Sequence, residues 1–288
     1  MFHLNKAKRE NVRLKIGLTG PSGSGKTLSA LKLAHGITGS WDNVVIADTE
    51  NNSALYYADN EKVGVGTFGH IPFEGPFSPQ RYVELINFVE QKTSAEVLIL
   101  DSVSHEWDAC ITLVDEYAKN ARNSFAAWGQ VTPLHNKFVT KMLQSPLHII
   151  ANIRSKQDYV IEANAKGKQV PRKVGLKGIQ RDGIDYEFGI MFDIEQSHYA
   201  TSSKDRTGLF ADAGPFMITE ETGKSLVAWA NSGIYVASLS QMTDLKRTCE
   251  LHGITDKDVM REISKKLINK EMSELEKIIK EVGTDGIK

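Results

Sequence analysis

Residues 14–38 read LKIGLTGPSGSGKTLSALKLAHGIT, and this stretch decides the fold. A short apolar run over residues 14–19 leads into the glycine-rich octapeptide GPSGSGKT at residues 20–27, and apolar residues at helical spacing follow. The octapeptide matches the pattern G-x-x-x-x-G-K-[S/T] in full. Because it stands between a buried strand and an amphipathic helix, it predicts a phosphate-binding loop, the P-loop.

Each part of the octapeptide has a chemical reason. Glycines let successive backbone N–H groups face phosphate oxygens, and the helix that follows directs the positive end of its dipole at them. Lys26 supplies a charge to the β and γ phosphates, and Thr27 supplies a hydroxyl ligand for Mg²⁺. The predicted cofactors are therefore ATP and Mg²⁺. The predicted nucleotide-binding residues are Gly20, Pro21, Ser22, Gly23, Ser24, Gly25, Lys26 and Thr27.

Short apolar runs rich in Val and Ile recur after the P-loop, and segments with helical spacing separate them. The runs cover residues 44–47, 97–100, 147–151 and 190–194; the helical segments cover residues 28–34, 82–89 and 134–142. Runs of this length and composition are typical of strands buried on both faces. Their alternation with helices predicts an α/β fold with a mostly parallel central sheet flanked by helices.

The pattern changes toward the C-terminus. Several β-prone pieces follow residue 190, and a helix is predicted over Glu220–Ala230. From residue 237 only helical stripes remain. The predicted organisation is a polar arm over residues 1–12, a core over residues 13–236 and a small helical C-terminal appendage over residues 237–288.

Composition excludes several classes of protein. The 288 residues are 41% hydrophobic, with 35 Lys and Arg against 36 Asp and Glu, which excludes a wholly basic nucleic-acid coat but allows a local basic patch. Two cysteines, Cys110 and Cys249, cannot form a disulfide framework, and neither has a Cys or His nearby at metal-ligand spacing. With no apolar run of about 18 residues, we expect a cytoplasmic protein without a membrane partner.

Two carboxylates complete the predicted site. A P-loop requires a carboxylate at the end of a buried strand to hold the water shell of Mg²⁺, and Asp101 follows the run over residues 97–100. Hydrolysis requires a base or a water-orienting group, and Glu50 follows the run over residues 44–47. Spacing alone fits equally well with Glu50 as a solvated loop residue.

Four blocks together resemble the RecA-like recombinase family of P-loop ATPases, in order and spacing, over roughly residues 13–210. The blocks are residues 20–27, 45–50, 98–103 and 149–154. Three segments look more narrowly like phage-encoded RecA-like ATPases associated with single-strand annealing. These segments are residues 49–54, 101–107 and 178–188.

The resemblance implies roles for single residues. It implies that Glu50 is the catalytic carboxylate and that Asp101 belongs to the magnesium shell. It also implies that the strand ending at Asn152 lies between the P-loop strand and the Asp101 strand, where a polar side chain touches the γ-phosphate. RecA itself usually has Gln at this place, so Asn152 is a shorter substitute; alternatively, it only closes the strand.

The segment after Asn152 corresponds to the family's second DNA-binding loop. Residues 154–181 carry eight cationic residues against two acidic ones, an excess of six positive charges. The resemblance implies that this loop or hairpin binds single-stranded DNA, with Tyr159 stacking on a base; a merely solvated charged face is the alternative. The candidate DNA contacts are Arg154, Lys156, Tyr159, Lys166, Lys168, Arg172, Lys173 and Lys177.

Lys204 and Arg206 resemble the cationic pair that some RecA-like proteins project into the ATP site of a neighbouring subunit. Such cations would neutralise charge on the transferred phosphate, and hydrolysis would then require a homo-oligomer, a ring or a filament. An ordinary exposed turn is the alternative. The C-terminal helices are a candidate surface for a single-strand binding protein or another recombination partner.

These observations lead to one expected function and two alternatives. The expected function is a DNA-stimulated ATPase that acts on single-stranded DNA in recombination or strand annealing. A P-loop kinase of a small molecule is the first alternative, although it would be expected to have an Arg-rich lid over its acceptor. A nucleotide-switched adaptor protein is the second.

Overall fold

The computed structural model describes residues 9, 12–119, 124–163, 169–232 and 249–250. Residues 13–227 form one compact unit, and residues 1–12 together with 228–288 form another. Almost all of the predicted helical appendage over residues 237–288 lies outside the described residues. Its boundary with the core stays a prediction.

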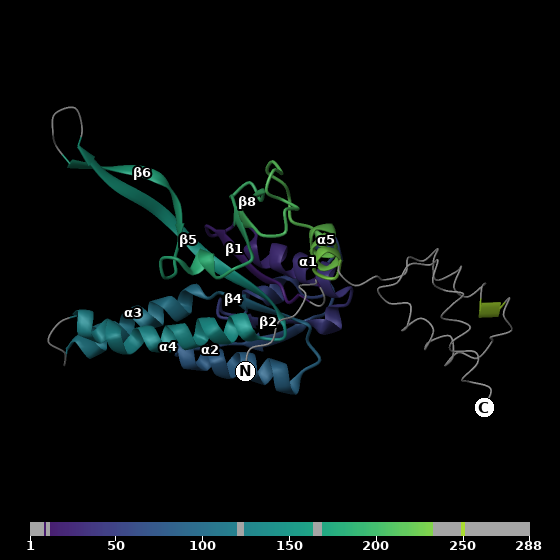
Figure 1. Cartoon of the computed structure of the whole chain (residues 1–288), viewed down its shortest axis with the longest axis horizontal. Coiled ribbons are helices and arrows are strands. Elements are labelled where there is room, and N and C mark those ends of the chain that lie inside the picture. The colour runs from purple at the N-terminus through teal and green to yellow at the C-terminus, as the bar shows by residue number, and fades with distance from the viewer. Residues whose placement is uncertain (1–8, 10–11, 120–123, 164–168, 233–248, 251–288) are drawn as a thin grey trace, which may run out of the picture. The chain divides into compact units, whose positions relative to one another are not determined.

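An eight-stranded sheet forms the centre of the larger unit, in the order β3-β2-β4-β5-β1-β7-β8, and β6 pairs with β5 alone (Figure 1). All pairings from β3 across to β7 are parallel, whereas β8 and β6 pair antiparallel. The predicted α/β fold with a mostly parallel sheet is confirmed. The strands are β1 Lys15–Gly20, β2 Val44–Asp48, β3 Gly69–Pro72, β4 Val97–Asp101, β5 His148–Ala163, β6 Gln169–Gly178, β7 Ile190–Ile194 and β8 Ala200–Asp205.

The position of β5 matters most for the site. It lies between β1 and β4, so that Asn152 pairs in register with Leu18 on one side and with Asp101 on the other. The prediction that this strand separates the P-loop strand from the Asp101 strand is confirmed. The strand is much longer than the predicted run over residues 147–151, because it continues past the sheet and pairs with β6.

Helices cover both faces of the sheet. On one face α2 and α4 share a core with the strands, in which Tyr82 and Phe138 pack among residues such as Leu98. On β4 the residue between Leu98 and Leu100 is Ile99, which points to the opposite face because side chains alternate along a strand. The helices are α1 Lys26–Thr38, α2 Pro79–Lys92, α3 Ser104–Ala118, α4 Ser124–Gln144 and α5 Glu220–Ala230.

Two glycines bring α1 and α5 into close contact. A Cβ atom at Gly36 would lie 2.0 Å from the carbonyl oxygen of Glu220, and one at Gly223 would lie 2.3 Å from that of Leu33. Only glycine allows backbones to approach this closely. The helix predicted over residues 220–230 is confirmed. Short 3₁₀ helices cover Trp41–Asn43, Ser53–Tyr57, Glu61–Val63 and Ile184–Tyr186.

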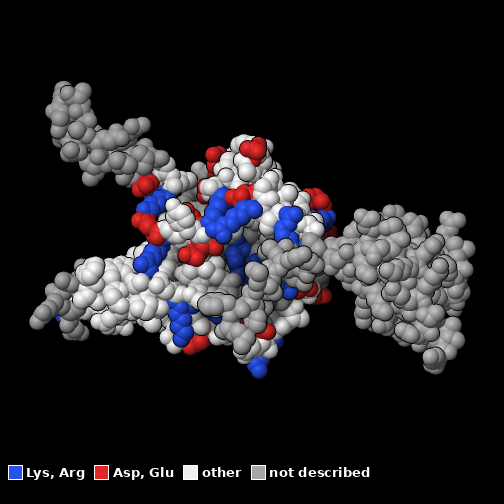
Figure 2. Space-filling model, viewed as in Figure 1, with Lys and Arg blue, Asp and Glu red and all other residues white. Residues whose placement is uncertain are grey.

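Surface charge is mixed in sign on one face of the molecule. Figure 2 shows Lys and Arg interspersed with Asp and Glu on the face in view. This agrees with the near-zero formal charge of −1. No helix within the described ranges combines the length and the apolar character that crossing a membrane demands.

Candidate active site

The P-loop connects β1 to α1 through two residues in the left-handed backbone region. Gly23 has φ +79° and Gly25 has φ +90°, a conformation that side chains with a Cβ rarely adopt. Helix α1 begins at Lys26, directly after Gly25. The conformation predicted from the glycine spacing is therefore present, and the first amides of α1 are available to an anion.

The loop packs tightly at its base. A Cβ atom at Gly20 would lie 2.5 Å from Ser24 Oγ and 2.6 Å from the Ile194 carbonyl oxygen, so this position has no room for a side chain. Ser24 Oγ is buried and has no hydrogen-bond partner among the described residues. A buried polar atom without a partner is costly, which fits a site built for a polar ligand. His198, from the turn between β7 and β8, lies with Nδ1 3.0 Å from the Ser24 carbonyl oxygen and was not predicted.

Lys26 folds back over the loop. Its Nζ donates to the carbonyl oxygens of Gly20 at 2.8 Å and Pro21 at 2.9 Å. Burial lowers the pKa of Lys26, and the charges of Asp101 and Glu50 oppose this shift. The ammonium group therefore faces the loop, where a phosphate can take the place of the two carbonyl groups.

Asp101 and Thr27 form the candidate magnesium site. Thr27 Oγ1 donates to Asp101 Oδ2 at 2.6 Å, and the Asp101 side chain is buried. Burial raises the pKa of Asp101 to about 6; the Thr27 hydroxyl and the Asn152 amide limit the rise, and the charge of Glu50 adds to it. A divalent cation beside this carboxylate would stabilise its ionised form, and hydroxyl and carboxylate oxygens are the ligands that Mg²⁺ prefers. The residues present thus fit Mg²⁺.

Asn152 lies beside Asp101 at the carboxyl end of β5. It is fully buried, and neither atom of its amide has a hydrogen bond of normal geometry. It does not line the cavity in front of the P-loop. Its predicted contact with a γ-phosphate stays a prediction.

Hydrogen bonds fix the backbone of the loop after β2, from which Glu50 projects. The buried Asp48 carboxylate accepts from the backbone N–H groups of Glu50 at 2.6 Å and Ala54 at 2.8 Å. The Thr49 N–H donates to the Asp101 carbonyl oxygen at 2.6 Å. These bonds fasten the loop both to itself and to the end of β4. Glu50 is consequently held at the mouth of the site rather than in a free loop.

Glu50 forms an ion pair with Arg154. Arg154 Nε donates to Glu50 Oε1 at 2.6 Å, and Arg154 Nη2 donates to Glu50 Oε2. Burial favours a higher pKa for Glu50, but the hydrogen bonds and the charge of Arg154 outweigh it and leave the pKa below its usual value. Arg154 was predicted to contact DNA, whereas its side chain lies on Glu50. This difference arises because Arg154 is still in the sheet region of β5, in register with Gly20 of the P-loop.

A cavity of about 970 Å³ joins these groups, a volume suited to a nucleotide. The P-loop, Glu50, Asp101 and Arg154 line one part of it, and residues 217–221 line another. The latter segment, which precedes and begins α5, was not predicted as part of the site. It has no motif, and only the packing of α5 on α1 brings it to the P-loop.

The candidate DNA-binding residues follow the hairpin formed by β5 and β6, which projects away from the rest of the sheet (Figure 1). Lys156 is exposed on β5, and Lys177 is exposed on β6 and pairs with Asp182 at 2.7 Å. Tyr159 lies opposite Lys173 in the strand pairing, and Arg172 is the next residue along the hairpin. Two of the predicted contacts, Lys166 and Lys168, lie outside the described residues.

A groove lies beside the base of this hairpin. It has a volume of about 910 Å³ and is lined by aromatic residues of α3 and α4 and by cations of the hairpin. Trp107 and Trp128 stack with ring centroids 5.4 Å apart, and Phe125 is 84% exposed. Lys156 and Arg181 line the same groove. Three carboxylates, Asp108, Asp158 and Asp182, line it as well, so the groove combines aromatic surface with charges of both signs.

Lys204 and Arg206 lie away from the P-loop cavity of their own chain. Lys204 Nζ donates to the carbonyl oxygens of Asp185 at 2.7 Å and Tyr186 at 2.8 Å, and Arg206 Nη2 lies 3.5 Å from the latter oxygen. Their predicted action on the ATP site of a neighbouring subunit stays a prediction.

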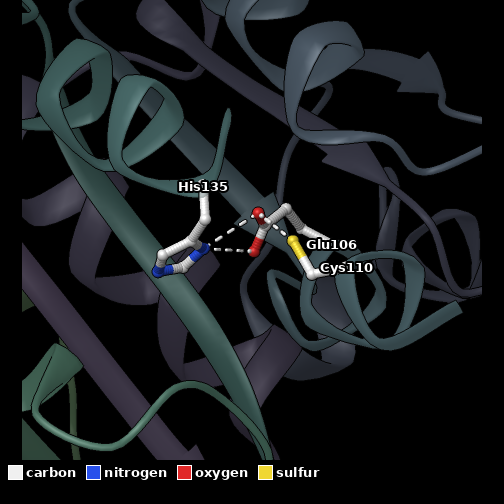
Figure 3. A group of neighbouring side chains, drawn as sticks. All are labelled: Glu106, Cys110 and His135. Carbon is white, nitrogen blue, oxygen red and sulfur yellow. Dashed lines mark hydrogen bonds and ion pairs between the residues drawn. The ribbon is translucent and has the colours of Figure 1, made fainter. Parts of the chain in front are cut away.

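A second cluster of ionisable side chains lies between α3 and α4, and the sequence pattern did not reveal it. Glu106 Oε1 lies 3.2 Å from Cys110 Sγ and 3.0 Å from His135 Nδ1, and all three residues are buried (Figure 3). Gln180 Nε2 donates to Glu106 Oε2 at 3.4 Å. Glu106 stands one helical turn before Cys110, and this spacing was the available signal.

The ligand atoms of this cluster lie within 4.8 Å of one another, close enough for a metal ion. Hydrogen bonds within the protein already account for them, because the Glu106 carboxylate accepts from Cys110, His135 and Gln180. Burial and the charge of Glu106 raise the pKa of Cys110, which keeps the thiol protonated. The cluster is a hydrogen-bonded connection between α3, α4 and the end of the hairpin.

A family model described as an AAA domain matches residues 13–230. The chain belongs to this AAA domain family. The P-loop, the Thr27–Asp101 pair and the position of β5 between the P-loop strand and the Asp101 strand agree with this family, so the chain is a P-loop protein of the ATPase type. No curated protein matches the chain.

Solved structures also resemble the AAA domain protein. One is the KaiC-like protein PH0186 from the hyperthermophilic archaeon Pyrococcus horikoshii OT3. It is 17% identical in sequence, with a TM-score of 0.41, over 73% of this chain and 88% of that chain.

Proposed function

We propose that this AAA domain protein hydrolyses ATP while bound to single-stranded DNA, in recombination or strand annealing, and that DNA stimulates hydrolysis. One observation carries the proposal. Strand β5 begins between the P-loop strand and the Asp101 strand and continues without interruption into the basic hairpin. Strand β5 thus contributes residues both to the nucleotide pocket and to the candidate DNA-binding hairpin.

The residues of the pocket have separate tasks in this proposal. Bound Mg²⁺ would neutralise charge on the phosphates. Lys26 binds the β and γ phosphates, and the amides of the P-loop orient them. Thr27 and Asp101 hold the metal with its water shell. Glu50 accepts a proton from the attacking water or orients it.

The hairpin and the neighbouring groove supply what a single strand requires. Cations along the hairpin bind phosphates of any sequence, and exposed rings such as Phe125 stack on bases without reading them. Lys156 and Arg181 line the same groove as Trp107 and Trp128, so cations for phosphates and rings for bases are available along one surface. Single-stranded DNA therefore fits this surface better than a folded duplex, whose bases are already stacked.

ATP turnover with and without single-stranded DNA tests the function. We expect DNA to raise turnover by the wild-type protein, and Lys26→Ala to remove turnover under both conditions. Turnover that ignores DNA but rises with a small phosphate acceptor would favour the kinase. Nucleotide binding without turnover would favour the adaptor.

A salt titration tests whether the hairpin is the DNA site. Replacing Lys166, Lys168, Arg172 and Lys173 with Ala should lower the slope of log affinity against log salt by about 3, since each phosphate contact contributes roughly 0.7 for a single strand. Tyr159→Ala should cost about 1–3 kcal/mol of binding with little change in slope, because stacking releases no counterions. An unchanged slope in the fourfold variant would move the DNA site elsewhere.

We also propose that the active form is an oligomer in which Lys204 and Arg206 act on the ATP of a neighbouring subunit. A Lys204→Ala/Arg206→Ala protein should then be inactive alone. It should regain turnover when mixed with the Lys26→Ala protein under conditions of subunit exchange. Turnover that stays near zero in verified mixed assemblies would assign the two cations to an ordinary surface turn.

A further inference from the structure

Arg154 occupies both oxygens of the candidate catalytic carboxylate. The guanidinium and the Glu50 carboxylate are paired in a two-point arrangement, Nε to Oε1 and Nη2 to Oε2. Both side chains line the cavity that holds the P-loop. In this arrangement both Glu50 oxygens accept from a cation, which makes the carboxylate a weaker base toward a water molecule.

The backbone of Arg154 is fixed on three sides. Arg154 is in register with Gly20 of the P-loop, its N–H donates to Ser104 Oγ at 2.9 Å, and its carbonyl oxygen accepts from the Ile179 N–H at 2.6 Å. The side chain can therefore change partner while the backbone stays in place. The same residue connects the P-loop, the start of α3 and the end of the hairpin.

The pair with Glu50 is open to competition. The Arg154 side chain is 39% exposed and that of Glu50 is 25% exposed, and ion pairs with such access to water are weak. Phosphate oxygens offer a guanidinium the same two-point geometry with more negative charge. Lys26 and Arg154 line the same cavity as Glu50, so a terminal phosphate bound by Lys26 would lie on the side of the cavity that Arg154 can reach.

We propose that Arg154 is a nucleotide-sensing residue that leaves Glu50 for the terminal phosphate when a nucleoside triphosphate binds. The exchange releases Glu50 to act on water and makes the site prefer a triphosphate to a diphosphate. This inference rests on nucleotide binding at the P-loop, as in the proposed function, but not on DNA. It assigns to Arg154 a role in the pocket in place of the DNA contact expected from the sequence.

Equilibrium binding tests the exchange without hydrolysis. A non-hydrolysable ATP analogue and ADP, each with Mg²⁺, are titrated into the full chain in the absence of DNA. Arg154→Gln should weaken analogue binding about tenfold and leave ADP binding nearly unchanged, because only the analogue has the third phosphate. Arg154→Lys should restore part of the difference, since an ammonium keeps the charge but not the two-point geometry.

Glu50→Gln tests the competition itself. Removing the charge of Glu50 frees Arg154, so the analogue should bind several-fold more tightly than to the wild type. In the Arg154→Gln/Glu50→Gln double variant this gain should disappear. Lys141→Gln is the matched control, because it breaks a partly buried ion pair with Glu90 away from the cavity. It should leave the ratio of analogue to ADP affinity unchanged.

Two results would overturn the inference. One is an equal loss of analogue and ADP binding in Arg154→Gln; the other is a gain from Glu50→Gln that persists without Arg154. Either would reduce the pair to a structural tie between β5 and the loop after β2, with the proposed ATPase intact. A wild-type protein that binds neither nucleotide would instead refute the proposed function together with the inference.

Discussion

Two clusters of ionisable and polar side chains lie near the start of α3. One lines an open cavity, and the other is buried and hydrogen-bonded within the protein. The pocket cluster, Lys26, Glu50, Asp101 and Arg154, faces a cavity of about 970 Å³. The buried cluster, Glu106 with Cys110, His135 and Gln180, is enclosed between α3, α4 and the end of the hairpin (Figure 3). The pocket cluster is thus accessible to a ligand, whereas the buried cluster connects α3, α4 and the segment after the hairpin.

The two clusters differ in how many of their buried polar atoms form hydrogen bonds. Around the pocket, the buried hydroxyls of Ser24 and Ser155 have no hydrogen-bond partner in the part of the chain that the structure describes, and burial raises the pKa of Asp101 to about 6. In the buried cluster, by contrast, both oxygens of Glu106 accept hydrogen bonds. Unsatisfied polar groups are tolerated where a ligand completes them, whereas an interior without a ligand must satisfy them itself. Substitutions in the pocket should therefore lower activity without a loss of stability, and substitutions in the buried cluster should lower stability.

Lys26→Ala should have the largest effect, a loss of ATP turnover of about 10³-fold, because it removes a cation from the reacting phosphates. The melting temperature should stay close to that of the wild type, since the ammonium group bonds only to loop carbonyls. Turnover assays check the loss of activity, and thermal unfolding checks that the melting temperature is unchanged. Near-normal turnover by a folded variant would overturn the P-loop assignment.

Glu106→Ala should lower the free energy of unfolding by about 3 kcal/mol, because it opens a cavity and leaves the buried His135 and Cys110 without their acceptor, whereas Gln180 keeps the Val103 carbonyl oxygen. Chemical denaturation measures the loss. The ATP turnover of the fraction that remains folded should be close to normal. A loss below 1 kcal/mol would remove the contrast between the two clusters.

Glu50→Gln should lower hydrolysis by about 10²-fold or more while nucleotide still binds. The amide keeps the size of the side chain and leaves the P-loop untouched. Single-turnover hydrolysis together with nucleotide binding separates the two effects. Unaltered hydrolysis per bound ATP would exclude Glu50 from the reaction.

Asp101→Asn should stabilise the protein in the absence of nucleotide, by on the order of 2 kcal/mol at pH 7. In the wild type, the raised pKa means that stability decreases as pH rises from about 4 to about 6, where the unfolded chain has lost its proton and the folded one retains it. The variant should lack this decrease. Unfolding measured from pH 4 to pH 7 checks the sign, and a less stable variant at pH 7 would contradict it.

Cys110→Ala should have the smallest effect, about 1 kcal/mol or less, because a thiol is a weak donor and Glu106 keeps its bonds to His135 and Gln180. Treatment with a chelator should leave the melting temperature of the wild type unchanged. A decrease on chelation that Cys110→Ala abolishes would show that the cluster holds a metal ion.

Much of the architecture could be predicted from local patterns in the sequence. The P-loop, the α/β alternation, Asp101 at a strand end and the helix over Glu220–Ala230 each follow from residues close together in the chain. Glycine spacing, apolar runs and helical periodicity act over a few residues, so the sequence reveals them directly. The place of β5 between its neighbours came from a family resemblance, which carries tertiary information indirectly.

Only the tertiary structure decided which side chains meet. Glu50 and Arg154 are 104 residues apart, and Glu106 and His135 are 29 residues apart. Strand order places Arg154 beside the P-loop rather than along the basic hairpin, and helix packing encloses Glu106. Such pairings depend on register and packing between distant elements, and no local pattern in the chain encodes them.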